Sequence, residues 1–306
     1  MPPPFQITRE ILTRCAAVMR KVGQYEGLRA PVPQPLLRRK NRIRTVHGSL
    51  AIEGNALTEQ QVTAVLDGKR VTGSPHDLRE AENAVTAYQT AGAWSAGSMR
   101  HLLTAHRTLM AGLISDAGRW RQGGVGVFRV EHLVAQLLKF VRNDAAPWLV
   151  KAAVVHCEIQ FIHPFSNGNG RTGRLWQHVA LRQVSPVFAH VPVESIIRRE
   201  QRAYYRVLKA CDRAGDSTQF IEMSLAWLEE SLGETLAAVR PERAEKTPRL
   251  ELARQPLGER EFSRKDYLAL FPGLSTASAS RDLAGGVEAK ALRRVGERAS
   301  SRYRFR

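Results

Sequence analysis

The chain has 306 residues, enough for two domains or for one large and one small domain. Hydrophobic residues make up 43% of it, which is typical of a globular protein with a buried core. No run approaches the ~18 uninterrupted apolar residues of a membrane helix, so no membrane partner is expected. The formal net charge of +17 favours polyanionic partners such as nucleotides, nucleic acid or acidic protein surfaces, unless arginine simply replaces lysine on solvated faces.

The N-terminus and the cysteines both indicate a cytoplasmic protein. The first residues, MPPPFQITREILTRC, lack the basic start, apolar segment and small-residue cleavage site of a signal peptide. Three widely spaced cysteines, Cys15, Cys157 and Cys211, fit reduced, buried thiols better than a disulfide framework or a zinc site.

Most of the chain has the periodicity of α-helices. Residues 6–23 place apolar side chains at close to 3.6-residue spacing, and the proline-rich stretch 29–37 predicts an extended connector. A helix over 57–68 would begin at Thr58 as N-cap, with Gln61 in position for a capping box. Further helices are predicted over 38–52, 77–91, 99–110, 131–142, 148–162, 170–184, 195–213 and 217–238.

Two regions depart from the helical pattern. Within 118–130, two short β-prone runs flank adjacent glycines, which predicts a small β-hairpin. Residues 239–257 hold three prolines among charges and are typical of a linker. Beyond the linker, a helix near 263–270, a turn, a helix starting at 275–278 and two short strands around a basic turn match the pattern of a winged helix.

The stretch HPFSNGNGRTGR contains the residues that predict a chemical activity. Gly168 and Gly170 permit positive φ, so backbone N–H groups can converge on an anion at the start of the next helix. Arg171 and Arg174, three residues apart, lie on one face of its first turn and could hold consecutive phosphates. His163 has the basicity to take a proton from a hydroxyl. By itself it would be a packed or capping histidine, and the arginines a solvated face, but together these residues predict transfer of a phosphate-linked group onto an alcohol.

This stretch resembles the Fic family signature, H-P-F-x-(D/E)-G-N-G-R-x-x-R. The matching positions are His163, Pro164, Phe165, Gly168, Asn169, Gly170, Arg171 and Arg174. GRWRQGGVGVF resembles the family's substrate-docking flap, and AAVVHCEIQFIHPF is similar to the helix that leads into the motif. The similarity covers most of residues 40–235. It implies a mainly α protein, a Fic helical bundle with a β-hairpin flap, followed by a small α+β winged-helix domain.

The expected domain organisation follows from these patterns. A helical region over 1–90 would carry a regulatory helix, and the Fic core would occupy 91–238. The linker over 239–257 would join it to the winged-helix-like domain over 258–306.

The resemblance implies transfer of AMP from ATP to a Ser, Thr or Tyr hydroxyl of a target protein, with Mg²⁺ or Mn²⁺ as the expected cofactor. His163 would be the general base, and Phe165 would anchor the loop. The implied nucleotide-binding residues are Gly168, Asn169, Gly170, Arg171 and Arg174. The flap residues that would align the target as an added strand are Gly124, Val125, Gly126 and Val127.

One position departs from the family pattern. Asn167 stands where most AMP-transferring members have an acidic metal ligand. An amide oxygen can ligate Mg²⁺, but without the negative charge that a hard cation favours. Weaker metal binding, another metal, another phosphate donor or reduced activity are all consistent with this change.

A second motif resembles a regulatory motif of the Fic family. SLAIEGN places Ser49 and Glu53 on one helical face, and alone Glu53 would be a surface or capping acid. The stretch resembles the inhibitory motif (S/T)-x-x-x-E-(G/N), whose glutamate pairs with the second arginine of the loop, here Arg174. The resemblance therefore implies autoinhibition and, in an active variant, modification of the chain itself. In some members this glutamate also helps to remove AMP.

The C-terminal region leaves a rival interpretation open. Residues 291–306 contain six arginines and one acid, with Tyr303 and Phe305 between them, as in a wing that contacts DNA phosphates. STASASRDL, with Arg281, would begin the recognition helix. Winged helices also bind proteins or form homodimers, and a basic tail is often only solvated. The alternative is a DNA-binding regulator whose Fic core senses nucleotide or uses another donor with weak catalytic activity.

Overall fold

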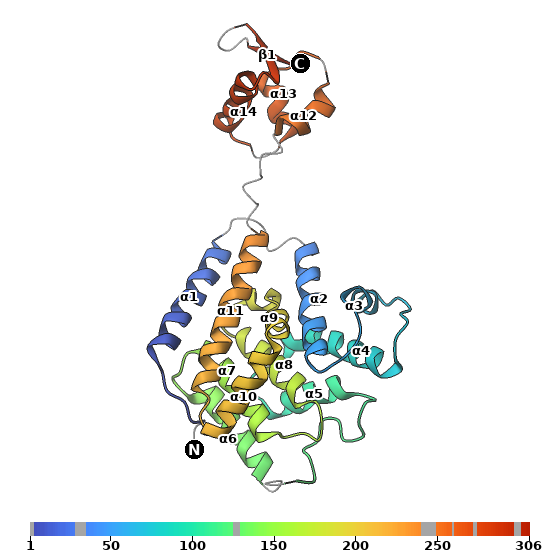
Figure 1. Cartoon of the computed structure of the whole chain (residues 1–306), viewed down its shortest axis with the longest axis vertical. Coiled ribbons are helices and arrows are strands. Elements are labelled where there is room, and N and C mark those ends of the chain that lie inside the picture. The colour runs from blue at the N-terminus through green and yellow to red at the C-terminus, as the bar shows by residue number, and fades with distance from the viewer. Residues whose placement is uncertain are drawn as a thin grey trace. The chain divides into compact units, whose positions relative to one another are not determined.

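The computed structural model describes residues 3–27, 35–124, 129–239, 249–258, 260–271, 274–296 and 301–306. The chain divides into two compact units, Met1–Val239 and Arg240–Arg306, and each is described by itself (Figure 1).

The first unit is helical. Its helices are α1 (Arg9–Glu26), α2 (Pro35–Ile52), α3 (Glu59–Leu66), α4 (Pro75–Thr90), α5 (Met99–Met110), α6 (Val130–Asn143), α7 (Trp148–Ile162), α8 (Asn169–Leu181), α9 (Val193–Arg199), α10 (Gln201–Ala214) and α11 (Thr218–Val239), with 3-10 turns at Ala91–Ala93 and Pro186–His190. The predicted helices are confirmed, except that 195–213 forms two helices. The backbone at Glu200, with φ −105° and ψ 28°, leaves the helical region and separates α9 from α10.

Local sequence signals explain several helix starts. Thr58 Oγ1 accepts the Gln61 backbone N–H at 3.2 Å, and the Gln61 side chain accepts the Thr58 N–H at 2.8 Å. This is the predicted capping box, which satisfies two backbone donors that the first turn of a helix leaves unpaired.

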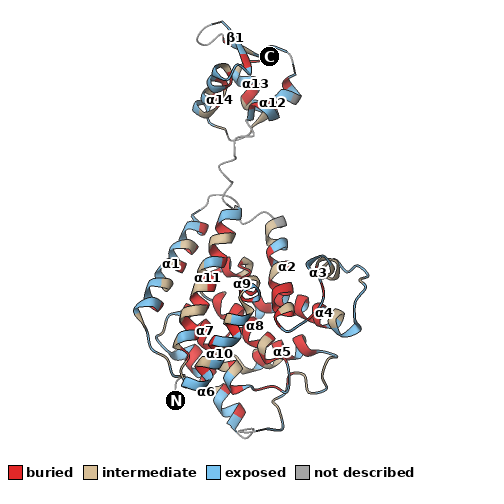
Figure 2. Cartoon of the chain, viewed as in Figure 1, coloured by how far each residue is buried: buried red, intermediate tan, exposed pale blue. Residues whose placement is uncertain are grey.

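The core of the first unit is centred on α7. Apolar side chains lie on every face of this helix, and most of its residues are buried (Figure 2). A helix that is hydrophobic all round must be covered on all sides, and α6, α8 and α11 pack against α7. α1 packs along α11, and α2 packs on α9 and α4. The loop between α7 and α8 therefore begins and ends on two of the most deeply buried helices.

The hairpin expected within 118–130 is not seen in the described part of this segment. Residues 118–124 form turns and bends without a strand, and 125–128, which include Val125, Gly126 and Val127 of the expected flap, lie outside the described residues. The backbone N–H of Arg121 donates to the Pro164 carbonyl at 3.0 Å. This part of the segment thus bonds to the α7–α8 loop rather than to a neighbouring strand.

The second unit contains α12 (Arg249–Leu257), α13 (Arg264–Leu270), α14 (Thr276–Glu288), β1 (Leu292–Val295) and β2 (Arg302–Phe305). The two strands are antiparallel, with Leu292 opposite Phe305. The expected linker is wrong over 249–257, where α12 buries Leu250, Ala253 and Leu257 in the core of this unit. Their spacing of three and four residues is helical, and the proline content of the stretch obscured it.

Two smaller expectations can also be compared with the structure. The cysteines are free thiols, with Cys157 and Cys211 buried and Cys15 half-buried. Over the described ranges, each helix is too short or too polar to cross a membrane.

Candidate active site

The α7–α8 loop has two left-handed residues that set its shape. His163 ends α7 with φ 50° and ψ 57°, and Gly168 precedes α8 with φ 79°. A Cβ on Gly168 would lie 2.5 Å from Met110 Sδ, so both its backbone conformation and its surroundings require glycine. His163 is exposed, and its carbonyl accepts the Arg121 Nε–H at 2.8 Å. The loop thus presents an imidazole at the surface beside the N-terminus of α8.

The loop is anchored from within. Phe165 is fully buried and stacks on His106, with ring centroids 3.6 Å apart, and on Trp120 at 5.3 Å. Asn169 Nδ2 donates to the Phe165 carbonyl at 2.8 Å, and Asn169 Oδ1 accepts the Phe165 N–H at 3.0 Å. The anchoring expected of Phe165 is present. The Asn169 side chain is bound to the loop's own backbone, so it fixes the shape of the loop.

Arg174 is one of two buried arginines of the site. Its Nη2 donates to Glu53 Oε1 at 2.8 Å and to the Ser49 carbonyl at 3.0 Å, and its Nε donates to Ser49 Oγ at 3.2 Å. Tyr204 Oη lies 3.5 Å from Nη1. Burial by itself would lower the pKa of Arg174, but Tyr204 and Glu53 hold it above its ordinary value. The structure therefore brings Ser49, Glu53 and Arg174 together, as the sequence motif predicts.

The Glu53 carboxylate lies against the first turn of α8. A Cβ on Gly170 would be 2.2 Å from Glu53 Oε1, so only glycine leaves room for this approach. The N-terminus of a helix carries partial positive charge and unpaired N–H groups, which favour an anion there. Glu53 therefore occupies a place where an anionic ligand would also be stabilised.

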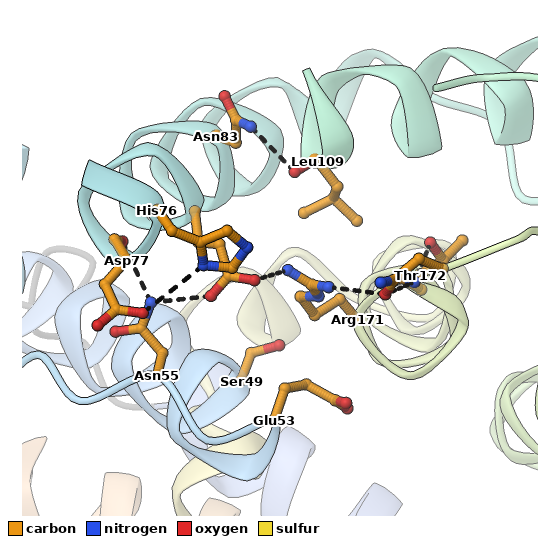
Figure 3. A network of polar contacts seen from close by, with 12 residues as sticks. Ser49, Glu53, Asn55, His76, Asp77, Asn83, Leu109, Arg171 and Thr172 are labelled. Atoms are coloured by element: carbon orange, nitrogen blue, oxygen red, sulfur yellow. Dashed lines mark hydrogen bonds and ion pairs between the residues drawn. The ribbon is translucent and has the colours of Figure 1, made fainter. Parts of the chain in front are cut away.

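Arg171 is paired with an acid that the sequence analysis did not identify. Its Nη1 forms an ion pair with Glu80 Oε1 of α4, and both side chains are buried. Its Nη2 donates to Asn167 Oδ1 at 3.3 Å, while its buried Nε has no hydrogen-bond partner in the described part of the chain. Figure 3 shows Arg171 on α8, reaching toward α4. A buried donor without a partner is unfavourable, so an acceptor oxygen at Nε would be stabilising.

Glu80 connects Arg171 of α8 with Asn55, which follows α2. Asn55 Nδ2 donates to Glu80 Oε2 at 2.9 Å and to the Asp77 carbonyl at 3.1 Å, and Asn55 Oδ1 accepts the Leu57 N–H at 3.1 Å (Figure 3). Asn55 directly follows the Glu53-Gly54 pair, so the segment that carries Glu53 is hydrogen-bonded to the acid that holds Arg171. The sequence signal that could have identified Glu80 is its position as an acid on the buried side of an amphipathic helix.

The end of α2 is held by α10. Gln201 Nε2 and Tyr205 Oη both donate to the Ile52 carbonyl, at 2.6 and 3.0 Å. These bonds satisfy a carbonyl that the end of a helix leaves unpaired, and they fix the residue next to Glu53. No sequence pattern pointed to Gln201 or Tyr205.

In the described part of the chain, no cation site forms at the loop. Asn167 is neutral, and its Oδ1 accepts the Gly168 N–H at 2.6 Å as well as the Arg171 Nη2–H. The described residues bring one set of potential ligands together, His76, Asp77 and Glu80, at the start of α4. Both Glu80 oxygens already accept hydrogen bonds, from Arg171 and Asn55, and the start of a helix disfavours a cation.

Besides Glu80, a second acid of the site is buried, and it lies near Arg174. Glu194 is 4% exposed, and the cavity that it lines is also lined by Arg174. Its Oε1 accepts the Tyr88 hydroxyl at 3.0 Å, and its Oε2 has no partner among the described residues. Burial raises the pKa of Glu194 to about 7, so the protonated form is favoured in the folded protein.

This burial predicts a pH dependence of stability. The pKa of Glu194 is raised from 4.5 to about 7. The stability that this carboxyl contributes to the folded state is therefore present at low pH and is lost as pH rises through 7. Between pH 5 and 8, the free energy of unfolding should therefore fall by about 2–3 kcal/mol more in the wild type than in Glu194→Gln. Urea unfolding at the two pH values measures the difference, and equal losses would contradict the assignment.

Comparisons with known proteins agree with this geometry. The Fic/DOC family model matches residues 97–181, from before α5 to the end of α8. The crystal structure of a Fic family protein from Desulfovibrio desulfuricans G20 is 36% identical with a TM-score of 0.75, and the match covers 100% of this chain and 98% of that chain. Fic-1 (residues 134–508) from Caenorhabditis elegans shares the fold, with 23% identity, a TM-score of 0.65, and coverage of 74% and 71%.

Curated relatives are more distant. Protein adenylyltransferase fic-1 of Caenorhabditis elegans is 26% identical over 217 residues, and protein adenylyltransferase Fic of Aedes aegypti is 26% identical over 211. These matches cover 64% and 62% of this chain, which spans only 41% of the length of each relative. The assignment to the family depends instead on two findings. One is the full-length match at 36% identity, and the other is the family model, which covers the loop that carries His163, Arg171 and Arg174. The chain belongs to the Fic family.

Proposed function

We propose that the protein is an autoinhibited protein adenylyltransferase, which transfers AMP from ATP to a hydroxyl of a target protein. The observation that carries the proposal is the ion pair between Glu53 and Arg174 at the N-terminus of α8, next to the exposed His163. Relatives named protein adenylyltransferases support the reaction type.

His163 would act as general base. A ring nitrogen takes the proton of the target hydroxyl while its oxygen bonds to the α-phosphorus of ATP. The bond from that phosphorus to the oxygen leading to the β-phosphate breaks, and pyrophosphate leaves. Anchoring of the loop by Phe165 and Asn169 would hold the imidazole in place, and such positioning is a large part of catalysis in phosphate transfer.

The phosphates would bind at the start of α8. The unpaired N–H groups of its first turn favour an anion, and Arg171 offers a buried Nε donor without a partner among the described residues. Gly170 leaves room for the close approach of an oxygen, and Glu53 Oε1 now occupies that space. Arg174 would take the γ-phosphate once Glu53 leaves it.

Glu53 would inhibit by occupying Arg174. A carboxylate and a phosphate oxygen compete for the same charge-assisted hydrogen bonds. With Glu53 in place, ATP would bind without the contact that aligns its α-phosphate for attack. Asn55, Gln201 and Tyr205 would hold the inhibitory segment in this position.

Labelled ATP tests the proposed reaction. The Glu53→Gly variant is incubated with bacterial lysate and ATP radiolabelled either on the α- or on the γ-phosphate. Proteins should retain label only from the α-phosphate, and intact-mass spectrometry should show a gain equal to AMP. Label transferred from the γ-phosphate would indicate phosphorylation and would overturn the proposal, as would the absence of any labelled protein, including the enzyme itself.

Asn167→Asp should alter metal dependence. The variant adds a negative charge where the family's acidic residue would stand, and hard divalent cations bind more tightly as ligand charge increases. In the Glu53→Gly background, the Mg²⁺ concentration for half-maximal labelling should fall by roughly tenfold. The matched control is Asn143→Asp, a change of the same chemistry at the end of α6. An equal Mg²⁺ dependence in both variants would contradict a metal role for position 167.

A second candidate function is DNA contact by the C-terminal unit, which we propose to be a winged helix. On its paired strands, exposed Arg293 lies opposite exposed Arg304, and exposed Arg302 lies opposite Val295. Such a ribbon suits contact with phosphates. A gel-shift assay across salt concentrations, with the full chain and with a chain ending at residue 239, should show salt-sensitive binding only by the full chain. Equal binding by both chains would exclude the C-terminal unit as the contact.

A further inference from the structure

His106 of α5 lies against the α7–α8 loop and contacts it in two ways. It is fully buried, and its ring stacks on that of Phe165, with the centroids 3.6 Å apart and an interplanar angle of 6°. Its Nε2 lies 3.0 Å from the Asn167 carbonyl oxygen. On the other side of the ring, Nδ1 accepts the Gly118 backbone N–H at 2.9 Å. One imidazole therefore contacts both the loop and the segment that follows α5.

The two backbone partners of His106 determine which ring nitrogen carries the proton. A backbone N–H can only donate, so the Nδ1 that faces Gly118 is unprotonated. A carbonyl oxygen can only accept, so the Nε2 that faces Asn167 carries the hydrogen. Burial lowers the pKa of His106 to about 4, which agrees with a neutral ring at neutral pH. The ring is therefore a donor toward the loop and an acceptor toward the segment.

The contact with His106 requires glycine at position 118. The φ of Gly118 is 78°, and a Cβ there would lie 2.8 Å from Arg107 Cβ and 2.9 Å from the Leu103 carbonyl oxygen. Only glycine combines this left-handed conformation with so close an approach to the backbone of α5. Because the chain packs so tightly on α5 at this point, its N–H reaches the Nδ1 of a side chain on that helix.

The same segment, residues 118–121, bonds directly to the start of the loop. The Arg121 N–H donates to the Pro164 carbonyl at 3.0 Å, and Arg121 Nε donates to the His163 carbonyl at 2.8 Å. The start of the loop is thus held by this segment directly, and its far end, at Asn167, is held through the imidazole.

We propose that His106 is a positioning residue for the α7–α8 loop and couples the loop to segment 118–121. The Nε2–H fixes the place of the Asn167 carbonyl, and the stacked ring supports Phe165 from below. His163 belongs to the same short loop, so a displaced loop would move the proposed base. The expected effect on rate rests on the proposed AMP transfer, whereas the tautomer and the order of the loop do not depend on it.

Loss of the imidazole should affect the chemical step more than ATP binding. The start of α8 has hydrogen bonds of its own, because the Thr172 N–H and Oγ1 donate to the Gly168 carbonyl at 2.9 and 2.8 Å. The groups proposed to bind phosphate should therefore stay in place. His106→Phe keeps an aromatic ring for the stack, but it removes the partner of both the Gly118 N–H and the Asn167 carbonyl.

NMR of the full chain without nucleotide tests the tautomer. Long-range ¹H–¹⁵N spectra of the histidine rings, with the His106 signals assigned by their absence in His106→Phe, should show a protonated Nε2 and an unprotonated Nδ1 at neutral pH. A proton on Nδ1, alone or together with one on Nε2, would exclude the two backbone bonds and would overturn the proposal.

Amide hydrogen exchange tests the order of the loop independently of catalysis. The N–H groups of Phe165 and Gly168 are bonded to asparagine side chains of the loop, so they report its order. They should exchange roughly fivefold faster in His106→Phe than in the wild type. The matched control is His101→Phe, the same change on the same helix, where the ring accepts the Ser95 N–H at 2.9 Å. Equal exchange of the loop in these two variants would contradict a positioning role.

Labelling rates test the effect on the reaction. In the Glu53→Gly background, His106→Phe should lower kcat for AMP transfer by roughly 10- to 100-fold and leave the KM for ATP unchanged. His106→Gln keeps a donor near the place of Nε2, and His106→Asn keeps an acceptor near that of Nδ1. The Gln variant should therefore recover more of the rate than the Asn variant. A role in packing alone predicts the opposite, with the Phe variant the most active of the three.

The combined results distinguish this proposal from the proposed function. If Glu53→Gly incorporates no AMP but the loop of His106→Phe exchanges faster, AMP transfer is wrong and the positioning role stands. If Glu53→Gly is labelled and the added His106→Phe change slows it no more than His101→Phe does, the positioning role is wrong. If the His106 variants do not fold, the tautomer in the wild type decides, since the Nε2–H form supports the proposal and the Nδ1–H form overturns it.

Discussion

Replacing Glu53 by glycine should increase self-labelling with AMP by roughly 10- to 100-fold. The carboxylate holds Arg174 through a charge-assisted hydrogen bond of 2.8 Å, and bonds of this kind contribute about 1.5–3 kcal/mol. Removal of the side chain also clears the space over Gly170 at the start of α8. Arg174 keeps its contacts with Ser49 and Tyr204, so the fold of the site should survive. Incorporation of ATP labelled on the α-phosphate measures the increase.

Two further variants define the cause of the increase. Glu53→Gln removes the charge but preserves the shape of the side chain, and we expect it to fall between the wild type and Glu53→Gly. Glu59→Ala removes an exposed acid from α3 and should leave labelling at the wild-type level. If Glu53→Gly is folded by circular dichroism and labels no faster than Glu59→Ala, the autoinhibition proposal is wrong.

Removing the imidazole of His163 should reduce labelling of the Glu53→Gly protein by about 10²- to 10⁴-fold, the usual contribution of a general base. His163 is exposed, so its ring adds little to the core. Its φ of 50°, however, places it in the left-handed region, where alanine is strained and asparagine is tolerated. His163→Asn therefore removes the proposed base and keeps the loop conformation, which makes it the matched partner of His163→Ala.

Nucleotide affinity separates catalysis from binding in these variants. His163→Asn should bind ATP as tightly as the Glu53→Gly parent, because the groups proposed to bind phosphate belong to α8. Arg174→Ala should instead weaken ATP binding, since it removes the cation assigned to the γ-phosphate. Label that survives in both His163 variants would show that another group takes the proton.

Local patterns in the sequence were sufficient for much of the first unit. The 3.6-residue periodicity predicted its helices, and Thr58 with Gln61 predicted the start of α3, because these signals act between residues within one turn of each other. The patterns failed where a long-range partner decides the structure. Residues 118–124 are β-prone, but the Arg121 N–H is satisfied by the Pro164 carbonyl instead of a strand.

The sequence by itself determined the helical class and the family resemblance, because these depend on periodicity and on motifs with fixed spacing, and the resemblance in turn implied the pairing of Glu53 with Arg174. The tertiary structure alone decided the partner of Arg171 and the contacts that hold the end of α2. Arg171 pairs with Glu80 across 91 residues of chain, and Gln201 of α10 donates to the Ile52 carbonyl at the end of α2. Such contacts depend on how helices pack around α7, and packing is set by the complementary shapes of many side chains, which no short sequence pattern encodes.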